Sequence, residues 1–564
     1  MKKFLALFLS LAMLLSMASF AVADELPTIT IMFHGSNVTD DTEVLEKVNE
    51  YIADKVGAKL DVIWGTWGDF DEKVVNTLVS ADSSVDMVFT CSWSADEYNT
   101  FAKNGYFLKL DDLIAEYGAD LAAALPEKLM DAARIEGAEG LGVYAVNGFK
   151  DYATQNCWDV NVTLLNELGY TLDDFKAMDF YSFGDLFAKA KEVKGDSFYP
   201  FLVEPMVLER MVTGSIIVSG DSGSVNLLSL YLNQDDVSAE GPYGNKLLNK
   251  FATPEYQKFV EKMHEYYEAG YINPALAVAE TSNDTRSNAQ KDAAYLVGTQ
   301  SYSFGYEITA SEERGIEVAM VPCTEPYVDS TALQGAMVAI STASEHPVES
   351  FKFLNLLNTD PTLMTLLNYG VEGVHYTLNE DGLVVWTAKH DDYKPWTNGM
   401  GNVTLLPDTK AEGKGFREAF RDYYANAKSF PALGYIFDNT EVANEMAALS
   451  NVAAQYALAL DAGAVDPATE LPAFLAALAS LFFCSIALTL SCLACFFARL
   501  AALAFSFLAS LACFSAAFFA AFLSALDGAF CFFSIFSTFC KLLSLLSTLF
   551  ACLCSIYKPH LLSL

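Results

Sequence analysis

The sequence predicts an α/β protein of two discontinuous lobes, followed by a hydrophobic tail of different composition. Strand and helix patterns alternate strictly over residues 29–110, and this βαβαβ order makes the first sheet parallel because parallel neighbours need a crossover helix. Later segments at 140–147, 316–322 and 368–376 are predicted to cross between the lobes three times. Composition then changes abruptly at residue 471.

The amino terminus has the pattern of a secretory signal peptide over residues 1–23. Lys2 and Lys3 precede an uncharged apolar run at 4–20, and Ala21-Val22-Ala23 is a small-residue cleavage site. The alternative is an N-terminal membrane anchor, but the apolar run is shorter than the ~20 residues that a membrane span needs. No cysteine lies near the cleavage site, so no lipid-modified cysteine is expected.

The first lobe is predicted from three apolar strands separated by amphipathic helices. In open parallel sheets, ligands bind beyond the carboxyl ends of the strands. This chain places aromatic side chains there, with His34 after the first strand, Trp64 and Trp67 after the second and Trp93 after the third. We therefore expect a flat, weakly polar ligand at this edge. The strands are predicted at 29–33, 60–63 and 85–89, and the helices at 42–56 and after residues 69 and 94.

Weaker patterns set the remaining boundaries. A strand at 335–341 and a helix at 347–357 are predicted to return to the first sheet, and residues 379–382 to form a hairpin. Helices are also predicted at 161–168, 182–193 and 253–267. The predicted division is lobe 1 at 24–146 and 324–375, lobe 2 at 147–323 and 376–470, and a tail at 471–564.

Charge and motifs exclude several classes of function. The formal net charge of −37 argues against nucleic acid or an anionic membrane as partner. Before residue 471 only Cys91, Cys157 and Cys323 occur, too few for a disulfide framework. His264-Glu265 lacks the second histidine of a zinc protease helix. No catalytic residue, metal or cofactor is therefore predicted, although paired carboxylates keep a carbohydrate-active enzyme as an alternative.

Five segments in order resemble the family-1 extracellular solute-binding proteins of ABC importers, the maltose-binding-protein-like group. They are TWGDFDEKV (66–74), SSVDMVFTCSW (83–93), NGYFLKLDDL (104–113), ATPEYQKFVEKMHEYYEAGYIN (252–273), and AISTASEHPVESFKFLNLL (339–357) with NYGVEGVHY (368–376).

This resemblance implies a two-lobed, periplasmic-binding-protein-like (type II) fold. It also implies a secreted monomer on the outer side of a bacterial membrane that closes on a carbohydrate and delivers it to ABC permease subunits. The last two segments look like the large oligosaccharide-binding branch. A binding protein for a peptide or another solute is the further alternative.

Pyranose rings offer C–H faces to aromatic side chains and hydroxyls to carboxylates and amides. A tryptophan in a globular protein can equally belong to the core, and His34 can be structural. The predicted ligand-binding residues are Trp67, Trp93, Trp158, Trp396, Asn156, Asp159, Tyr302, Tyr369, Glu372 and His34.

The tail consists almost wholly of Ala, Leu, Phe, Ser and Cys, and contains no Val, Met, Asn, Gln, Glu or Trp. Its uncharged stretches at 471–498 and 500–526 are long enough to span a bilayer, so association with a membrane is one interpretation. The narrow alphabet favours another, a reading-frame shift near residue 478. In that case residues 467–478 are the opening turns of a lost amphipathic helix.

Overall fold

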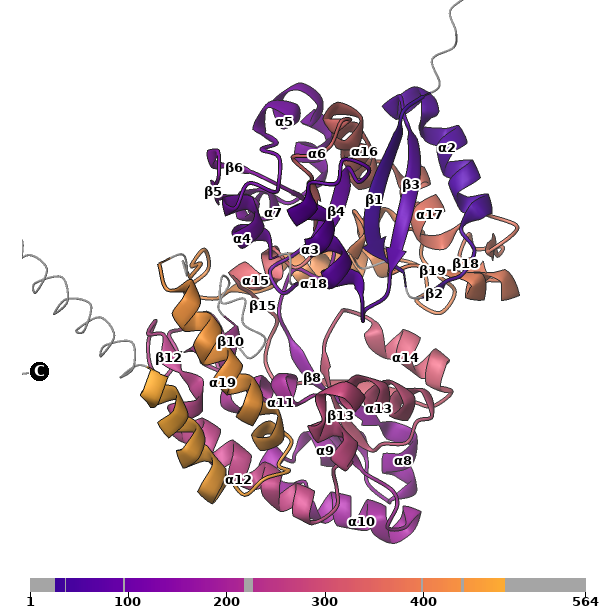
Figure 1. Cartoon of the computed structure of the whole chain (residues 1–564). Helices are drawn as coiled ribbons and strands as arrows, with labels where there is room; N and C mark the ends of the chain where they lie inside the picture. Colours follow the sequence, from indigo (N-terminus) through magenta and orange to yellow (C-terminus); the bar gives the residue numbers. More distant parts are fainter. Residues whose placement is uncertain are drawn as a thin grey trace, which may run out of the picture. The chain divides into compact units, whose positions relative to one another are not determined.

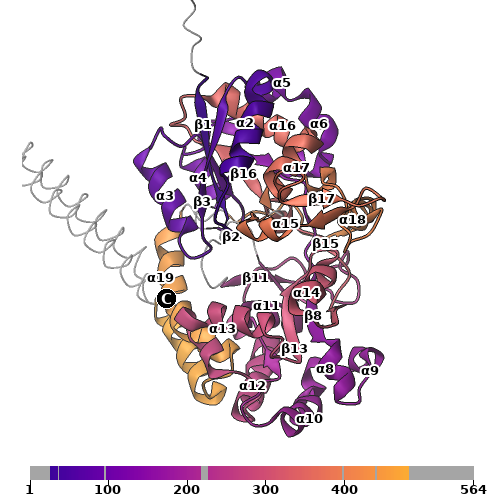
Figure 2. The same ribbon diagram turned by 90° about the vertical axis from the view of Figure 1, so that its right-hand side faces the viewer.

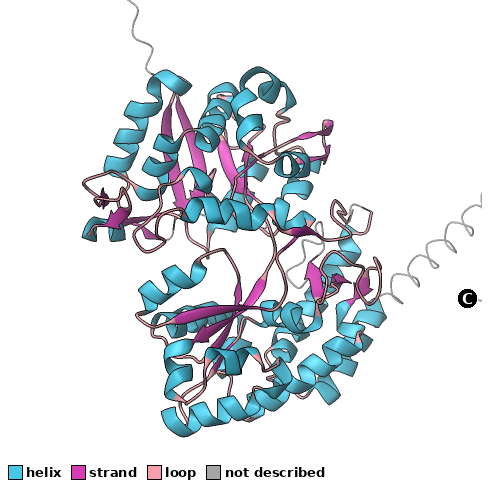
Figure 3. Cartoon of the chain, turned by 180° about the vertical axis from the view of Figure 1, so that it is seen from behind, coloured by secondary structure: helices cyan, strands magenta, loops and turns pink. Residues whose placement is uncertain are grey.

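The computed structural model describes residues 26–35, 37–94, 97–217, 227–396, 399–437 and 441–481. Two main sheets, each with its own hydrophobic core, organise these residues, and helices pack around both of them (Figures 1 and 3). We call the parts built on the two cores the first lobe and the second lobe. The predicted signal peptide and most of the predicted tail lie outside the described residues.

The first sheet has the strand order β3-β1-β4-β16-β7. As predicted, β1 is parallel to both β3 and β4, while β16 returns antiparallel to β4. All but the first residue of β1 are buried, as expected for a strand covered on both faces. The strands are β1 Thr28–His34, β3 Lys59–Gly65, β4 Met87–Thr90, β7 Val146–Asn147 and β16 Met337–Ile340.

Amphipathic helices cover this sheet. In α2 (Thr42–Val56) the buried residues Val44, Val48, Ile52 and Val56 follow helical spacing, and Gly57 ends the helix in the left-handed conformation. Figure 2 shows α2 beside α16. The other helices of this lobe are α3 Phe70–Ser80, α4 Tyr98–Lys103, α5 Asp111–Tyr117, α6 Ala119–Ala124, α7 Glu127–Ala132, α15 Ser330–Leu333, α16 Pro347–Thr359, α17 Pro361–Tyr369 and α18 Phe416–Ala425.

The second sheet has the order β14-β8-β13-β9, with β8 antiparallel to both neighbours. A smaller sheet, β10-β11-β12, follows α11 in the chain. The strands are β8 Asn156–Asn161, β9 Phe201–Leu202, β10 Ser215–Ile217, β11 Leu228–Tyr231, β12 Leu248–Asn249, β13 Val297–Ser301 and β14 Val318–Pro322. The helices are α8 Val162–Glu167, α9 Leu172–Lys176, α10 Gly184–Lys194, α11 Pro205–Thr213, α12 Pro254–Glu268, α13 Ala279–Lys291, α14 Tyr306–Arg314 and α19 Ala443–Asp461.

Three segments of chain pass between the lobes side by side. Thr154 and Tyr327 exchange two backbone hydrogen bonds of 2.7 and 3.1 Å, and β15 (Tyr327–Val328) pairs with β20 (Lys428–Ser429). The first two passages were predicted too early in the chain, at 140–147 and 316–322, because these segments end in β7 of the first sheet and β14 of the second. The third was predicted at 368–376, and this is wrong, because it occurs at β20.

Residues 376–424 were predicted in the second lobe, but they belong to the first lobe. Tyr376, Tyr393, Phe416 and Tyr424 are buried in the first core, and the expected hairpin is formed there by β17 (Tyr376–Leu378) and β18 (Val384–Trp386). The remaining short strands are β2 Asn37–Val38, β5 Arg134–Gly137, β6 Gly140–Val143 and β19 Tyr393–Lys394.

Two helices at the end of the described chain complete the second core. Helix α19 buries Ala453, Ala457 and Leu460, and a helix at 467–481 buries Leu471, Phe474 and Leu478. The predicted start of the tail at 471 is therefore too early. A search of the described residues finds no helix with the length and hydropathy needed to cross a membrane.

Candidate functional site

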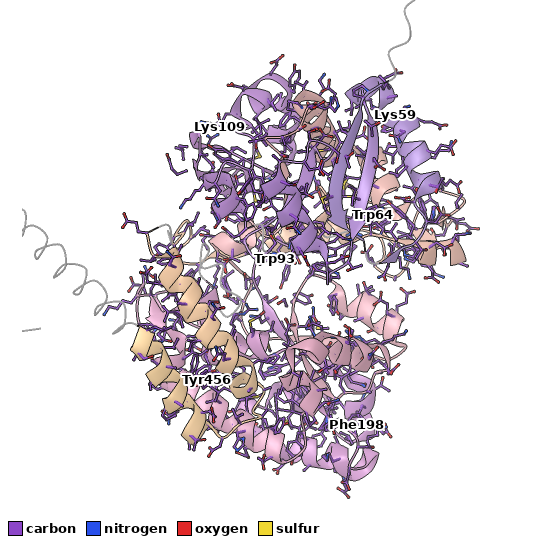
Figure 4. The ribbon with its side chains drawn as sticks, in the orientation of Figure 1. Lys59, Trp64, Trp93, Lys109, Phe198 and Tyr456 are labelled. Atoms are coloured by element: carbon purple, nitrogen blue, oxygen red, sulfur yellow. The ribbon has the colours of Figure 1, made fainter. Side chains whose placement is uncertain are left out.

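Three tryptophans gather beyond the carboxyl-terminal edge of the first sheet, where the sequence predicted an aromatic rim. Trp67 follows β3, Trp93 follows β4, and Trp396 follows β19. The ring centroids of Trp67 and Trp93 lie 6.2 Å apart, and the Trp396 centroid lies 5.0 Å and 6.0 Å from theirs. We call these three residues the tryptophan cluster. Figure 4 labels Trp93 at this edge.

The cluster keeps aromatic surface exposed to solvent. Trp67 is 56% exposed and Trp93 is 45% exposed, high values for indoles. The Trp93 Nε1 donates a hydrogen bond of 2.9 Å to the Gly335 carbonyl, which fixes its ring. Gly399 allows Trp396 to approach, because an added Cβ would lie 2.3 Å from the Trp396 ring.

His34 lies beneath the cluster as a supporting layer. Its ring stacks on Trp67 at a centroid distance of 4.0 Å and contacts Phe70 at 3.9 Å, and the residue is only 2% exposed. Burial lowers the pKa of His34 to about 4, so the imidazole is neutral at physiological pH. The residue does not line the pocket described next, so the structure places it behind the predicted surface.

A pocket of about 210 Å³ lies beside Trp93 and is lined from both lobes. The first lobe contributes Trp93 and residues of and next to α15, while the second lobe contributes residues of β8, α11 and the end of β13. The lining residues are Trp93, Lys150, Asp151, Ala153, Thr154, Gln155, Asn156, Arg210, Ile216, Ser301, Tyr302, Tyr327, Asp329, Thr331, Ala332 and Gly335. We call it the inter-lobe pocket.

Polar groups surround this pocket. Asn156, at the start of β8, accepts a hydrogen bond of 3.4 Å from the Ser301 hydroxyl through its Oδ1. Burial raises the pKa of Tyr302 above its ordinary value, so its phenol stays protonated. The pocket thus combines an exposed indole with neutral donors and acceptors from the opposite lobe.

Besides His34, four of the predicted residues lie away from this pocket. Trp158 packs against Phe183 at 5.0 Å and lines a separate cavity of about 300 Å³ within the second lobe. Asp159 is fully buried and forms an ion pair of 2.7 Å with Arg314. Tyr369 is buried in the first core, and Glu372 is exposed beyond α17. Of the ten predicted residues, Trp93, Asn156 and Tyr302 line the pocket, and Trp67 and Trp396 adjoin it through Trp93.

Arg210 is one of the lining residues that the sequence prediction missed. It lies in the last turn of α11, which begins with Pro205 and ends at Gly214 in the left-handed conformation. These two residues are recognisable helix boundaries, but nothing local indicates which lobe the helix would face. Within the described ranges, no group of three or more His, Cys, Asp or Glu side chains could hold a metal ion.

Comparisons with known proteins agree with this architecture. A family model described as "Domain of unknown function (DUF3502)" matches residues 431–481, the segment that contains α19 and the last described helix. A carbohydrate ABC transporter substrate-binding protein of Streptococcus pneumoniae serotype 4 (strain ATCC BAA-334 / TIGR4) is 27% identical over 453 residues, covering 79% of this chain and 86% of the relative.

Solved structures of solute-binding proteins are also similar to this chain. The N-glycan transport solute binding protein (NgtS) of Streptococcus pneumoniae in complex with Man1GlcNAc is similar with a TM-score of 0.66 and 25% identity, over 80% of this chain and 95% of that one. An HMO binding, ABC-transporter associated solute binding protein of Bifidobacterium longum infantis ATCC 15697 is similar in fold. Its TM-score is 0.53 at 16% identity, over 81% and 96% of the two chains.

Proposed function

We propose that this chain is an extracellular solute-binding protein of an ABC transporter, like the relatives it resembles, and that it binds an oligosaccharide between its lobes and delivers it to a permease. The single observation that carries the proposal is the inter-lobe pocket, where Trp93 of one lobe faces hydrogen-bonding side chains of the other.

The chemistry of the pocket suits a sugar. An exposed indole face packs against the C–H groups of a pyranose ring, and amide and hydroxyl groups bond to the hydroxyls around its rim. In this proposal the tryptophan cluster binds sugar rings, while Asn156 and Tyr302 bond to hydroxyl groups. Three indoles next to one pocket favour a ligand of more than one ring.

The lobes would act by population shift. A ligand that touches both lobes stabilises the closed arrangement, and only that arrangement docks productively on the permease. The three passages at Thr154, Tyr327 and Lys428 are the hinge in this proposal, since they connect the lobes. We propose that the protein acts outside the cytoplasm as a monomer, and that it binds its ligand without changing it chemically.

A thermal-shift screen of the full chain against a panel of glycans, followed by calorimetry on those that bind, tests this function. Trp93→Ala should weaken binding at least tenfold, whereas Trp386→Ala, an indole that does not line the pocket, should leave the affinity unchanged. Failure of every glycan to bind, or hydrolysis of one during incubation, would contradict the proposal. Hydrolysis would favour the carbohydrate-active enzyme.

Residues 471–481 belong to the second lobe, and we retain the reading-frame hypothesis for the residues beyond them. Its support is that the DUF3502 match ends at residue 481, close to the proposed frame shift near residue 478. Resequencing the locus, together with mass spectrometry of tail peptides, tests the hypothesis. An intact frame with those peptides present would refute it.

A further inference from the structure

Arg210 is a half-buried cation in the inter-lobe pocket that no carboxylate contacts within the described part of the chain. Arg314, Arg286 and Arg417 are also partly or fully buried, and each forms an ion pair, with Asp159, Glu204 and Glu412 respectively. Arg210 therefore lines the pocket without forming an ion pair among the described residues.

The neighbouring residue holds Arg210 in this position. Glu209 points into the second core, where it pairs with Lys250 at 3.0 Å and accepts hydrogen bonds from Thr213 and Ser215. Because successive residues of a helix point in different directions, anchoring Glu209 inside leaves Arg210 at the pocket. Helix α11 thus holds the guanidinium at the pocket wall before any ligand arrives.

The carboxyl groups that line the pocket already have partners. Asp151 pairs with Lys150, and Asp329 accepts hydrogen bonds from the Ala332 amide at 2.7 Å and the Thr154 hydroxyl at 3.1 Å. Burial raises the pKa of Asp329, while the nearby charge of Arg210 acts in the opposite direction. Lys150 and Asp151 pair with each other, whereas neither Arg210 nor Asp329 forms an ion pair within the described ranges; the charge of Arg210 acts on Asp329 without a direct contact.

We propose that Arg210 binds a carboxylate group of the ligand, so that the preferred ligand is an acidic oligosaccharide. A guanidinium presents its N–H groups as a planar fork that matches the two oxygens of a carboxylate, and such charge-assisted pairs are stronger than bonds to neutral hydroxyls. A partly desolvated cation without a direct ion pair costs free energy, and an anionic ligand would reduce that cost. This inference rests on the proposed function and adds the class of sugar.

Calorimetry with a matched pair of ligands tests the inference on the full chain. The pair is a uronate-containing oligosaccharide and its carboxyl-reduced neutral counterpart, and a sialylated glycan with its desialylated form gives a second pair. In at least one pair the acidic form should bind about tenfold to a hundredfold more tightly at low salt. The difference should narrow as sodium chloride is added, since salt screens the interaction.

Variants identify the residue responsible. Arg210→Gln should remove the preference by weakening only the acidic ligand, and Arg210→Lys should keep part of it. Arg421→Gln, at an exposed position of α18, should change neither affinity. Equal affinities in both pairs, or an equal loss for acidic and neutral ligands in Arg210→Gln, would overturn the inference and leave the proposed function intact. Absence of binding to any saccharide would overturn both.

Discussion

Removing the positive charge of Lys250 should destabilise the second lobe strongly. The side chains of Lys250 and Glu209 are 3% and 0% exposed, and their charged atoms lie 3.0 Å apart. Lys250→Met keeps most of the side-chain volume but leaves the Glu209 carboxylate buried without a counter-charge. Breaking a buried pair in this way costs about 3 to 5 kcal/mol. The hydroxyls of Thr213 and Ser215 still bond to Glu209, so we expect a loss of about 3 kcal/mol.

Urea denaturation followed by circular dichroism measures this loss. Adding Glu209→Gln to Lys250→Met should restore most of the stability, because the amide is neutral and still accepts the two hydroxyl hydrogen bonds. Lys262→Met is the matched control, since its partner Glu265 is mostly exposed and surface pairs contribute about 1 kcal/mol or less. A loss below about 1 kcal/mol in Lys250→Met, or no recovery in the double variant, would refute the reasoning.

Three further outcomes are expected. Burial raises the pKa of Asp461 to about 7, above its unfolded value of 3.8, so folding binds a proton between these values. Stability should therefore fall as the pH rises from about 4 to 7, and Asp461→Asn should remove this dependence in thermal melts at several pH values. Asp159→Ala should lower the free energy of unfolding by about 3 to 5 kcal/mol while the folded protein keeps its glycan affinity, because Asp159 pairs with Arg314 away from the pocket; a selective loss of affinity would contradict this. Truncation after Leu481 should leave the melting temperature and binding unchanged, whereas Phe474→Ala, which empties a site between Phe251 and Tyr456, should cost about 3 to 5 kcal/mol.

The first sheet could be predicted because its strands are long apolar runs and its helices keep regular spacing. The position of the tryptophans followed from the same pattern, since the residue after a parallel strand must lie at the ligand edge. The third passage could not be predicted. Strand β20 has two residues, both exposed, and so carries no periodicity.

The positions of site residues were harder to predict where a side chain contacts another residue that is distant in the sequence. Asp159 next to Trp158 has the appearance of a ligand-binding pair, but it is neutralised by Arg314, 155 residues further along the chain. Trp158 packs within the second lobe because Phe180 and Phe183 surround it, which only the tertiary structure reveals. Arg210 was missed because nothing in the sequence near it indicates that α11 lines the inter-lobe pocket.

A crystal structure of the full chain with the tightest-binding glycan would show directly where the ligand binds. We expect a saccharide in the inter-lobe pocket, with one ring packed on Trp93 and hydroxyl groups within hydrogen-bond distance of Asn156 and Tyr302. A glycan bound instead in the cavity beside Trp158, or on the outer surface of one lobe with the inter-lobe pocket empty, would contradict it.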